Sequence, residues 1–570
     1  MRLRFVCLVV GLVAACGGSN GATPGPGDAG EAGAIAEAGA TGDDGASPSD
    51  DGGLSQEAGA CTSTVTPAPG LVATDTGPVQ GTQASGTWAY LGIPYAAPPV
   101  GALRWAATQA HACWSAPLAA ASFGAECLQV DSADTTNVLG QEDCLTANVW
   151  APANATPASK LPTLVFVHGG GNVQGSSGES ASGDTPAYEG AALAAEENAV
   201  VVTFNYRLGA LGFLAHPAFG ANPGNYGVLD QVFALGWVHR NAAAFGGDPS
   251  HVLLFGQSAG AEDVCNLVAS PLTKGLFSAA LMESGACTDH ALATAESFAQ
   301  SWAQKAGCGN AADVAGCLRA LDGNAVTLVE PEPASVAAPG QGDYEPDVDG
   351  VAIPAPSEQV LGSGAYAHVP LVIGSNSDET ARELAGTYPS GMTTAQYQAA
   401  VLAYVKNDQD LASQVLAEYP VASFPSPLEA YVQVSTDAKF TCNARRDARL
   451  AAQGQPDQPV WRYFFTHHLD DASAATKALG AWHGLELAFV FDDVAEGGYA
   501  PSSAELTLAS TLGGAWTSMA AGGAPDVGAS VAWPKYDAST DPYVQLDDTL
   551  TTGTGVRTTL CDFWDGIAGQ

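Results

Sequence analysis

The sequence has few basic residues, with 19 Lys and Arg against 59 Asp and Glu, so the formal net charge is −40. Nucleic acids and anionic membrane surfaces repel such a chain, and we expect neither as a partner. It also lacks a long hydrophobic run near its start, because the apolar stretch from Phe5 to Ala14 is too short to span a bilayer. There are no internal repeats and no second nucleotide-type motif.

The first residues have the layout of an export signal. Arg2 and Arg4 precede the apolar run, and Val13-Ala14-Ala15-Cys16 follows. Small residues directly before a cysteine resemble a bacterial lipobox, so residues 1–15 are predicted to be a lipoprotein-type signal peptide and Cys16 the lipidated first residue. An ordinary cleaved signal is the alternative. In either case we expect export, as a cell-envelope lipoprotein at the outer membrane or cell surface, or as a secreted soluble protein.

The segment 16–60 lacks Lys, Arg and aromatic residues and consists largely of Gly, Ala, Ser, Pro and acids. Such a composition cannot bury enough apolar surface to order the chain, so a disordered acidic tether is predicted. Residues 61–570, with ample apolar material, are predicted to form a single folded domain. Any membrane contact would then be through Cys16 only, and the oligomeric state stays open.

The chain has 12 cysteines. Cys7 would be removed with the signal peptide and the thiol of Cys16 would carry the lipid, so an even number of cysteines is left to pair. An exported chain folds in an oxidising compartment, so disulfides are favoured over metal binding, and no Cys/His spacing suggests zinc. The pairing does not follow from counting. The remaining cysteines are Cys61, Cys113, Cys127, Cys144, Cys265, Cys287, Cys308, Cys317, Cys442 and Cys561.

A buried strand is predicted to end at the most informative motif, Gly256-Gln257-Ser258-Ala259-Gly260. In this G-x-S-x-G pattern the chain turns sharply from strand to helix, and the positions two before and two after the serine have no room for a side chain. The serine is then raised above the sheet edge, so Ser258 is a candidate nucleophile. A chain with 67 glycines can also contain these five letters by chance, and the context decides.

A run of glycines follows another predicted strand, Thr163 to Val167, in the sequence His168-Gly169-Gly170-Gly171-Asn172. Successive glycines leave backbone N–H groups free to point into a cavity, where they can stabilise a developing anion. The alternative is a flexible loop.

Strands and helices alternate along this part of the chain. The order predicts a mostly parallel central sheet covered by helices on both faces, with the site at the carboxyl ends of the strands. Gly246 to Pro249 is expected to be a turn. Predicted strands are Thr146 to Trp150, Val200 to Asn205 and Ala279 to Glu283, and predicted helices are Ala191 to Glu197, Gly227 to Phe245 and Ala261 to Ala269.

Five motifs in order carry a resemblance to a known family. They are Glu142-Asp143-Cys144-Leu145, His168-Gly169-Gly170-Gly171, Asn205-Tyr206-Arg207-Leu208-Gly209, Gly246-Gly247-Asp248-Pro249 and Gly256-Gln257-Ser258-Ala259-Gly260. From about residue 64 to 568 the chain resembles the type-B carboxylesterase/lipase family, the cholinesterase-like branch of the α/β-hydrolases. The resemblance implies the α/β-hydrolase fold and an acyl-ester hydrolase with a Ser, Glu, His triad in that chain order.

The acid should follow a late strand, and His368 to Gly374 is that strand. It leads into Ser375-Asn376-Ser377-Asp378-Glu379-Thr380. The family pattern D-E-G selects Glu379 over Asp378, although this sequence has Thr380 where the family has glycine.

The base must lie downstream of the acid, which leaves His467, His468 and His483. The first two end a predicted strand, Val460 to Phe465, and we expect them to turn out to solvent. His483 matches the family pattern H-G-x-E and is the predicted base. It would take the Ser258 proton and return it to the leaving alcohol, while Glu379 orients its ring.

The resemblance implies further roles. Backbone N–H groups of Gly170, Gly171 and Ala259 would form the oxyanion hole, Glu486 and Ser284 would brace the site, and no metal or organic cofactor is needed. It also implies ion pairs of Arg104 with Glu142 and of Arg207 with Asp230. The implied disulfides are Cys127–Cys144, Cys308–Cys317 and Cys442–Cys561, while Cys61–Cys113 and Cys265–Cys287 follow by elimination only.

The expected substrate is a small-molecule neutral carboxylic ester, with lipase-like action on longer acyl chains left open. Cholinesterases have an acidic residue directly before the serine and a tryptophan in the first disulfide loop. Here Gln257 is neutral and Leu128 to Asp143 contains no aromatic residue, so choline esters are not expected. The alternatives are a non-catalytic adhesion or binding member of the fold, and an amidase or peptidase that uses the same triad.

Overall fold

A computed structural model of the chain describes residue 61 and residues 68–178, 188–220, 223–338, 342–495, 498–529 and 531–568. The predicted signal peptide, Cys16 and the tether therefore lie outside the described residues. None of the described helices is long and apolar enough to cross a membrane.

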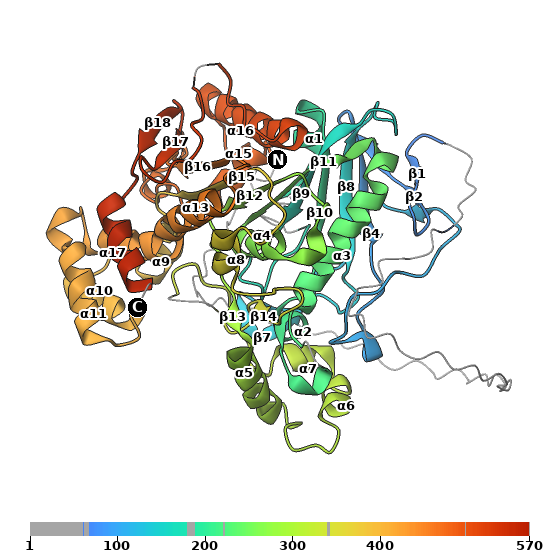
Figure 1. Cartoon of the computed structure of the whole chain (residues 1–570), viewed down its shortest axis with the longest axis horizontal. Helices are drawn as coiled ribbons and strands as arrows, with labels where there is room; N and C mark the ends of the chain where they lie inside the picture. The colour runs from blue at the N-terminus through green and yellow to red at the C-terminus, as the bar shows by residue number, and fades with distance from the viewer. Residues whose placement is uncertain are drawn as a thin grey trace, which may run out of the picture.

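An 11-stranded sheet runs through the middle of the molecule (Figure 1). Its strands, from one edge to the other, are β18 (Thr551–Thr554), β17 (Pro542–Leu546), β16 (Val460–Phe465), β15 (Leu371–Asn376), β12 (Ala279–Glu283), β11 (Gly247–Gln257), β9 (Leu161–Val167), β10 (Val200–Phe204), β8 (Thr146–Pro152), β4 (Thr87–Pro94) and β3 (Thr82–Ala84).

Neighbouring strands from β17 to β10 are parallel, and the antiparallel pairs lie at the two edges of the sheet. The sheet is therefore mostly parallel, and the predicted α/β-hydrolase fold is confirmed. Because β9, β11 and β15 run in one direction, the loops that follow them meet at the same edge.

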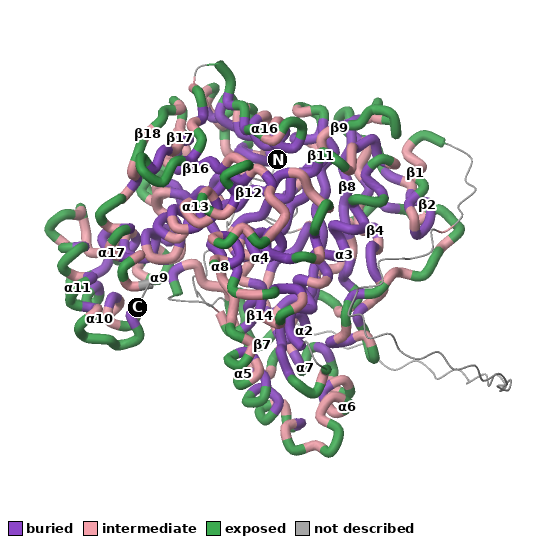
Figure 2. Tube along the Cα trace, in the orientation of Figure 1, coloured by how far each residue is buried: buried purple, intermediate pink, exposed green. Residues whose placement is uncertain are grey.

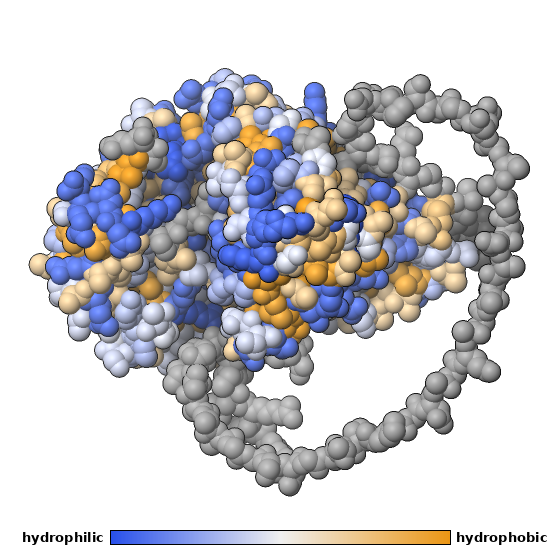
Figure 3. All heavy atoms as spheres, turned by 90° about the horizontal axis from the view of Figure 1, so that it is seen from below, coloured by the Kyte–Doolittle hydropathy of each residue, from blue (hydrophilic) through white to orange (hydrophobic). Residues whose placement is uncertain are grey.

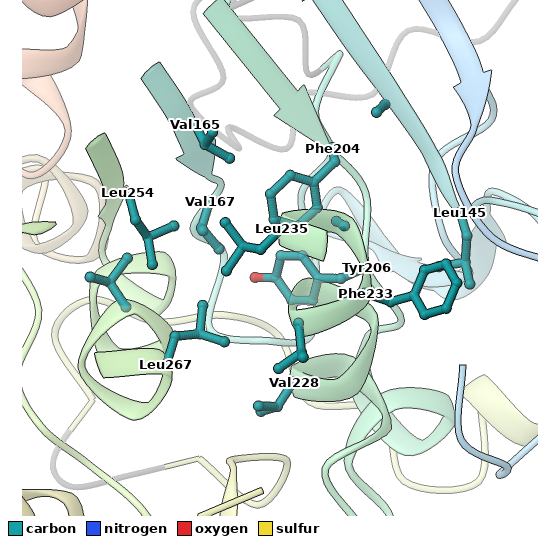
Figure 4. Close-up of a cluster of buried hydrophobic side chains, with 14 of the residues drawn as sticks. Leu145, Val165, Val167, Phe204, Tyr206, Val228, Phe233, Leu235, Leu254 and Leu267 are labelled. Carbon is teal, nitrogen blue, oxygen red and sulfur yellow. The ribbon is translucent and has the colours of Figure 1, made fainter. Parts of the chain in front are cut away.

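Side chains alternate between two cores, one on each face of the sheet. On β9, Val165 and Val167 belong to the core beneath α3 and α4, whereas Leu164 and Phe166 belong to the core beneath α15 and α16. Figure 4 shows the first core, where valines of β9 face leucines of the covering helices. Strands that are buried on both faces explain the continuous apolar runs in the sequence. Figure 2 shows the same pattern, with buried strands inside and exposure concentrated on the outer helices.

Helices cover both faces of the sheet. They are α1 (Ala191–Glu196), α2 (Gly209–Phe213), α3 (Tyr226–Asn241), α4 (Ala259–Ala269), α5 (Leu292–Lys305), α6 (Val314–Arg319), α7 (Gly323–Thr327), α8 (Ser357–Ser363), α9 (Ala381–Thr387), α10 (Thr394–Tyr404), α11 (Gln409–Glu418), α12 (Pro427–Thr436), α13 (Cys442–Gly454), α14 (Ala474–Lys477), α15 (Leu485–Val490), α16 (Ser503–Gly522) and α17 (Thr558–Ala568). Two runs of them, α5 to α7 and α9 to α13, follow one another without an intervening strand.

Short elements complete the fold. The small strands are β1 (Leu71–Ala73), β2 (Pro78–Gln80), β5 (Leu118–Ala119), β6 (Gln129–Asp131), β7 (Asp134–Leu139), β13 (His290–Ala291) and β14 (Asp347–Val348). The 3₁₀ turns are η1 (Gly101–Leu103), η2 (Pro217–Phe219), η3 (Ala242–Phe245), η4 (Pro271–Thr273) and η5 (Val421–Ser423), and η6 (Asp437–Thr441) is a π-helical turn.

Three of the expected elements are corrected. The helix expected over residues 227–245 is the α-helix α3 followed by the 3₁₀ turn η3. The helix expected from Ala261 begins at Ala259, directly after the serine. The segment expected as a turn at Gly246 to Pro249 instead opens β11 at Gly247, with an irregular register before Val252. Pairing of Gly247 with Leu161 of β9 extends the strand, which the local sequence could not indicate.

A third hydrophobic cluster joins α10, α11, α12 and α17. Of these helices, α10, α11 and α17 are labelled near one another on the left of Figure 1. The helices α12, η6 and α13 follow one another without a break over residues 427–454. On the face shown in Figure 3, polar residues are mixed with small apolar patches. The described chain has five disulfides: Cys61–Cys113, Cys127–Cys144, Cys265–Cys287, Cys308–Cys317 and Cys442–Cys561.

Candidate active site

Ser258 lies at the sharp turn between β11 and α4, with a left-handed backbone at φ 59°. Its N–H donates to the carbonyl of Glu283 at 2.9 Å, which ties the turn to the neighbouring strand β12. A Cβ on Gly256 would lie 2.4 Å from the carbonyl oxygen of Gly260, and one on Gly260 would lie 2.1 Å from that of Val167. Both glycines are therefore required by close backbone packing, and the half-buried serine is held in a strained conformation typical of a nucleophile elbow.

The glycine loop after β9 lies against this turn. Gly170 has φ 112°, and a Cβ there would lie 2.1 Å from the carbonyl oxygen of Gln174. The loop rests on Tyr206, whose hydroxyl donates to the carbonyl of His168 at 2.9 Å and whose ring stacks on the His168 ring. Burial lowers the pKa of His168 to about 4, so this ring is neutral at pH 7. The loop is thus held in place by hydrogen bonding and ring stacking at its start.

His483 and Glu379 form a direct pair, with 2.6 Å between His483 Nδ1 and Glu379 Oε2. The backbone N–H of His483 also donates to the Glu379 carbonyl at 3.0 Å, so the two loops are joined by a backbone hydrogen bond as well as by the side chains. The Glu379 carboxylate is fully buried and takes a second hydrogen bond, from the N–H of Asn376 at 2.7 Å. Since a carboxylate only accepts, we assign the Nδ1 proton to His483 and leave a lone pair on its Nε2.

Asp378, the other candidate acid, faces a different set of groups. Its Oδ2 accepts from the Ser377 hydroxyl at 2.5 Å and from the N–H of Ala481 at 3.2 Å, which braces the loop that carries His483. Thr380, which stands at the family's glycine position, is buried, and its hydroxyl lies 2.7 Å from that of Ser435 on α12. The threonine is therefore accommodated without displacing Glu379.

Glu486 and Ser284 are connected to the Glu379 carboxylate through Asn376, whose N–H donates to Glu379 and whose side-chain amide donates to Glu486. Glu486 and Ser284 are both buried, with 3.5 Å between Ser284 Oγ and Glu486 Oε1. Burial, and then the nearby carboxylate of Glu379, raise the pKa of Glu486 to about 7. Close to neutral pH, Glu486 therefore exchanges between a carboxylate and a carboxylic acid beside the pair.

His483 also contacts two residues, through Nε2 and through the face of its ring, that the sequence analysis did not predict. The side-chain amide nitrogen of Gln257 lies 3.1 Å from His483 Nε2, and the Phe440 ring packs against the imidazole with 5.0 Å between centroids. Because Nε2 carries the lone pair, the amide N–H donates to it in this resting arrangement. No local motif could have indicated these contacts, since Gln257 and His483 are 226 residues apart.

One cavity of about 330 Å³ brings the site together. Ser258 and His483 line it, as do Gly170, Gly171 and Ala259, the expected oxyanion donors. Ala259 is the first residue of α4, so its N–H has no partner within its own helix. The cavity therefore has a hydroxyl, an imidazole and backbone N–H groups on one surface, which is the set needed for attack on a carbonyl.

The expected position of His467 is corrected by the structure. We expected it to turn out to solvent, but it is buried just after the end of β16, with Nε2 3.2 Å from Glu505 and Nδ1 3.3 Å from Asp547. Glu505 caps α16, and this long-range contact draws the ring inward, whereas His468 is exposed as expected. Among the described residues, His467, Asp470 and Asp548 are the group close enough to share a metal ion, but His467 already contacts carboxylates and none of the three lines the cavity.

Two ion pairs hold the surrounding loops. Arg207 makes a bidentate contact with buried Asp230, at 2.7 Å and 2.8 Å, and Arg104 Nε lies 2.6 Å from Glu142. Arg104 also donates to the carbonyl of Leu321 at 2.6 Å. These are the pairs expected from the resemblance, and in the structure they join segments distant in the sequence.

Comparison with known proteins gives a consistent result. A family model described as "Carboxylesterase family" matches residues 68–564. The chain is 35% identical to para-nitrobenzyl esterase of Bacillus subtilis (strain 168), over 84% of this chain and 95% of that protein. It is 32% identical to fumonisin B1 esterase of Sphingopyxis macrogoltabida, over 81% of this chain and 84% of that protein. It is 30% identical to liver carboxylesterase of Sus scrofa, over 84% of this chain and 89% of that protein.

Proposed function

Since the chain belongs to the carboxylesterase family and is a carboxylic-ester hydrolase, we propose that Ser258, His483 and Glu379 carry out its reaction through an acyl-enzyme. The observation that carries the assignment is the 2.6 Å contact between His483 and Glu379 in a site whose cavity also contains the strained Ser258. The carboxylate fixes the imidazole tautomer, so that Nε2 is the proton acceptor.

The proposed reaction begins when the Ser258 hydroxyl replaces the Gln257 amide at His483 Nε2. The serine oxygen attacks the ester carbonyl as its proton passes to Nε2, and backbone N–H groups of Gly170, Gly171 and Ala259 stabilise the resulting oxyanion. Each such donor contributes about 2.7–4 kcal/mol of barrier lowering. The imidazolium then returns the proton to the leaving alcohol, and water repeats the sequence to release the acid.

The substrate class is proposed to be neutral carboxylic esters. The residue before the serine, Gln257, is neutral, and its amide is engaged with His483, so it offers no charge to a quaternary ammonium. We assign Glu486 and Ser284 the role of bracing Glu379, because Asn376 connects them to its carboxylate and neither lines the cavity.

The disulfides and the N-terminal sequence support a proposal for the location of the protein. Disulfides favour an exported protein. The finer assignment, a lipoprotein anchored at Cys16 with residues 16–60 as a tether and residues 61–570 as one catalytic domain, is a proposal from the sequence. Labelling with a radioactive fatty acid in wild type and Cys16→Ser tests the anchor: label that survives the substitution contradicts it.

Replacing Ser258 with Ala tests the proposed chemistry. We expect hydrolysis of p-nitrophenyl acetate to fall by about 10³-fold or more, to the level supported by binding and the oxyanion donors alone. Ser250→Ala, which changes an exposed serine at the start of β11, serves as the control. The matching p-nitroanilide is expected to react far more slowly than the ester; equal rates would favour an amidase.

A further inference from the structure

The cavity that contains Ser258 and His483 is also lined by polar side chains that ester hydrolysis does not use. We call this set the polar wall: Glu262, Thr288, Glu345, Lys439 and Asn443. Aromatic rings of Tyr404 and Phe440 line the same cavity. Ala334, Val336 and Ala438 also line it, so the cavity combines polar and apolar surface in comparable amounts.

Rigid elements hold the polar wall in place. Glu262 lies in the first turn of α4, four positions after Ser258, and Lys439 comes from the π-helical turn η6. Lys439 Nζ donates to the carbonyl of Ser335 at 3.2 Å, and the Asn443 amide donates to the carbonyl of Lys439 at 2.9 Å. The π turn is a common device for pointing side chains into a functional site.

The ionisable groups of the polar wall are two carboxyls and one ammonium. Burial, followed by the charges of Glu262 and Asp263, raises the pKa of Glu345 well above its ordinary value, which favours the uncharged form of this carboxyl. Burial also raises the pKa of Glu262, whereas the Lys439 ammonium lowers it. Lys439 therefore balances Glu262, and the wall offers hydrogen-bond donors and acceptors but little net charge.

An alkyl chain bound against this wall would remove water from the ionised and hydroxyl groups without replacing its hydrogen bonds. Hydroxyl groups of a ligand would replace them, as both donors and acceptors. Sites built to hydrogen-bond a substrate hydroxyl reject the analogue that lacks it by large factors, up to about 10⁴–10⁵. The chemistry of the wall therefore favours a neutral, hydroxylated ligand over an aliphatic one.

We infer that the polar wall makes this enzyme selective for esters whose alcohol or acyl part carries several hydroxyl groups, the chemistry of acylated sugars and glycerol. This inference rests on the proposed function, since it assigns a substrate class to the same site. It also implies that the lipase-like action left open by the sequence is poor.

Matched ester pairs test the inference. The butanoate of methyl glucoside is compared with hexyl butanoate, and glycerol monobutanoate with propyl butanoate, which vary only the alcohol. Methyl gluconate and methyl hexanoate vary the acyl part. We expect kcat/KM to be about tenfold or more higher for the hydroxylated member of at least one pair. The sugar and glycerol pairs separate the two sources of hydroxyls. Equal values, or a preference for the alkyl member, in all three pairs would overturn the inference.

Variants of the wall locate the selectivity. Glu262→Leu and Lys439→Met should each reduce the preference about tenfold. Each should also raise kcat/KM on the alkyl ester, which at the same time shows that the variant has folded. Glu262→Gln keeps a hydrogen-bonding group, so its preference for the hydroxylated ester should fall less than that of Glu262→Leu. Glu429→Leu is the matched control, because Glu429 lies in the first turn of α12 but is exposed and outside the cavity.

An unchanged preference in both wall variants would also contradict the inference. The failure of the proposed function looks different. If Ser258→Ala still hydrolyses p-nitrophenyl acetate, the assigned nucleophile is wrong; if that variant is inactive and no hydroxylated ester is preferred, only the inference falls.

Discussion

At the scale of single residues, the candidate site is a set of side chains whose positions depend on backbone contacts. His483 is held through both its ring and its N–H to Glu379, and Ser258 through its N–H to β12. The sequence predicted Ser258, Glu379 and His483 because each has a local signature beside it. It could not predict that Gln257 occupies His483 Nε2 or that Phe440 packs on the ring, because those contacts depend on the tertiary fold.

Glu379→Gln tests the role of the carboxylate. An amide cannot stabilise the imidazolium and can hold the wrong tautomer, so we expect kcat on p-nitrophenyl butyrate to fall by about 10⁴-fold with little change in stability. Asp378→Asn alters the adjacent carboxylate, which accepts a hydrogen bond from Ala481, and serves as the control. Its kcat should fall far less. Equal losses in the two variants would argue that Glu379 has no special role.

Gly170→Ala tests the oxyanion loop. The added methyl would lie 2.1 Å from the carbonyl oxygen of Gln174 and must displace the loop, so we expect kcat to fall by about 10²–10³-fold. Gly350→Ala is the control, because Gly350 also has a left-handed φ, of 79°, but has open space around it and lies outside the cavity. Stopped-flow measurement of acylation should locate the loss in that step; normal acylation in Gly170→Ala would contradict the assignment.

At the scale of elements, the sequence predicted the central strands well because strands buried on both faces are continuous apolar runs. It missed the π turn η6, which is an irregularity in a long helix over residues 427–454 and has no composition of its own. It also misplaced His467, because the capping of α16 by Glu505 draws that ring inward from a distant part of the chain.

The contact of His467 with the cap of α16 predicts a pH-dependent stability. Burial alone would lower the pKa of His467, but hydrogen bonds to Asp547 and Glu505 raise it above its ordinary value of 6.5. A histidine whose pKa is raised on folding stabilises the protein fully below the unfolded value and loses that contribution as pH rises through the folded value.

We therefore expect His467→Asn to lower Tm more at pH 5.5 than at pH 8.5. These two pH values lie about one unit below and about two units above the ordinary pKa of a histidine. Thermal unfolding of wild type and variant at the two pH values measures this difference. His468→Asn, which alters the exposed neighbour, should lower Tm equally little at both. A loss that does not depend on pH in His467→Asn would show that the ring acts by packing alone.

At the scale of the whole molecule, the sequence predicted an exported chain whose cysteines pair, and the described chain contains five disulfides. The Cys442–Cys561 bridge closes the longest loop of the five, at 119 residues, and joins α13 to α17 in the third hydrophobic cluster. Counting alone could not give this pairing, because the partner cysteines lie on elements that only the fold brings together.

Replacing Cys442 and Cys561 together with Ser should lower the free energy of unfolding by about 2–5 kcal/mol, since the bridge restricts the unfolded chain. The kcat at 25 °C should change little, because neither residue lines the cavity. Denaturant unfolding and a kinetic assay on the same preparation check both statements. A full loss of activity in a variant that remains folded would mean that α17 supports the site directly.

Removal of residues 1–60 should leave kcat and KM unchanged, because that segment lacks the apolar and aromatic residues needed to contribute to a core. The truncated chain keeps Cys61 and hence its bridge to Cys113. Lower turnover with an intact fold would show that the segment contributes to the site.

The central claim, that Ser258 is the nucleophile of this esterase, is tested most directly by an organophosphate that labels activated serines. The account predicts one adduct, located by mass spectrometry on Ser258, with activity lost in proportion to labelling and no adduct in Ser258→Ala. Complete inactivation without an adduct on Ser258, or equal labelling of the Ser258→Ala variant, would contradict it.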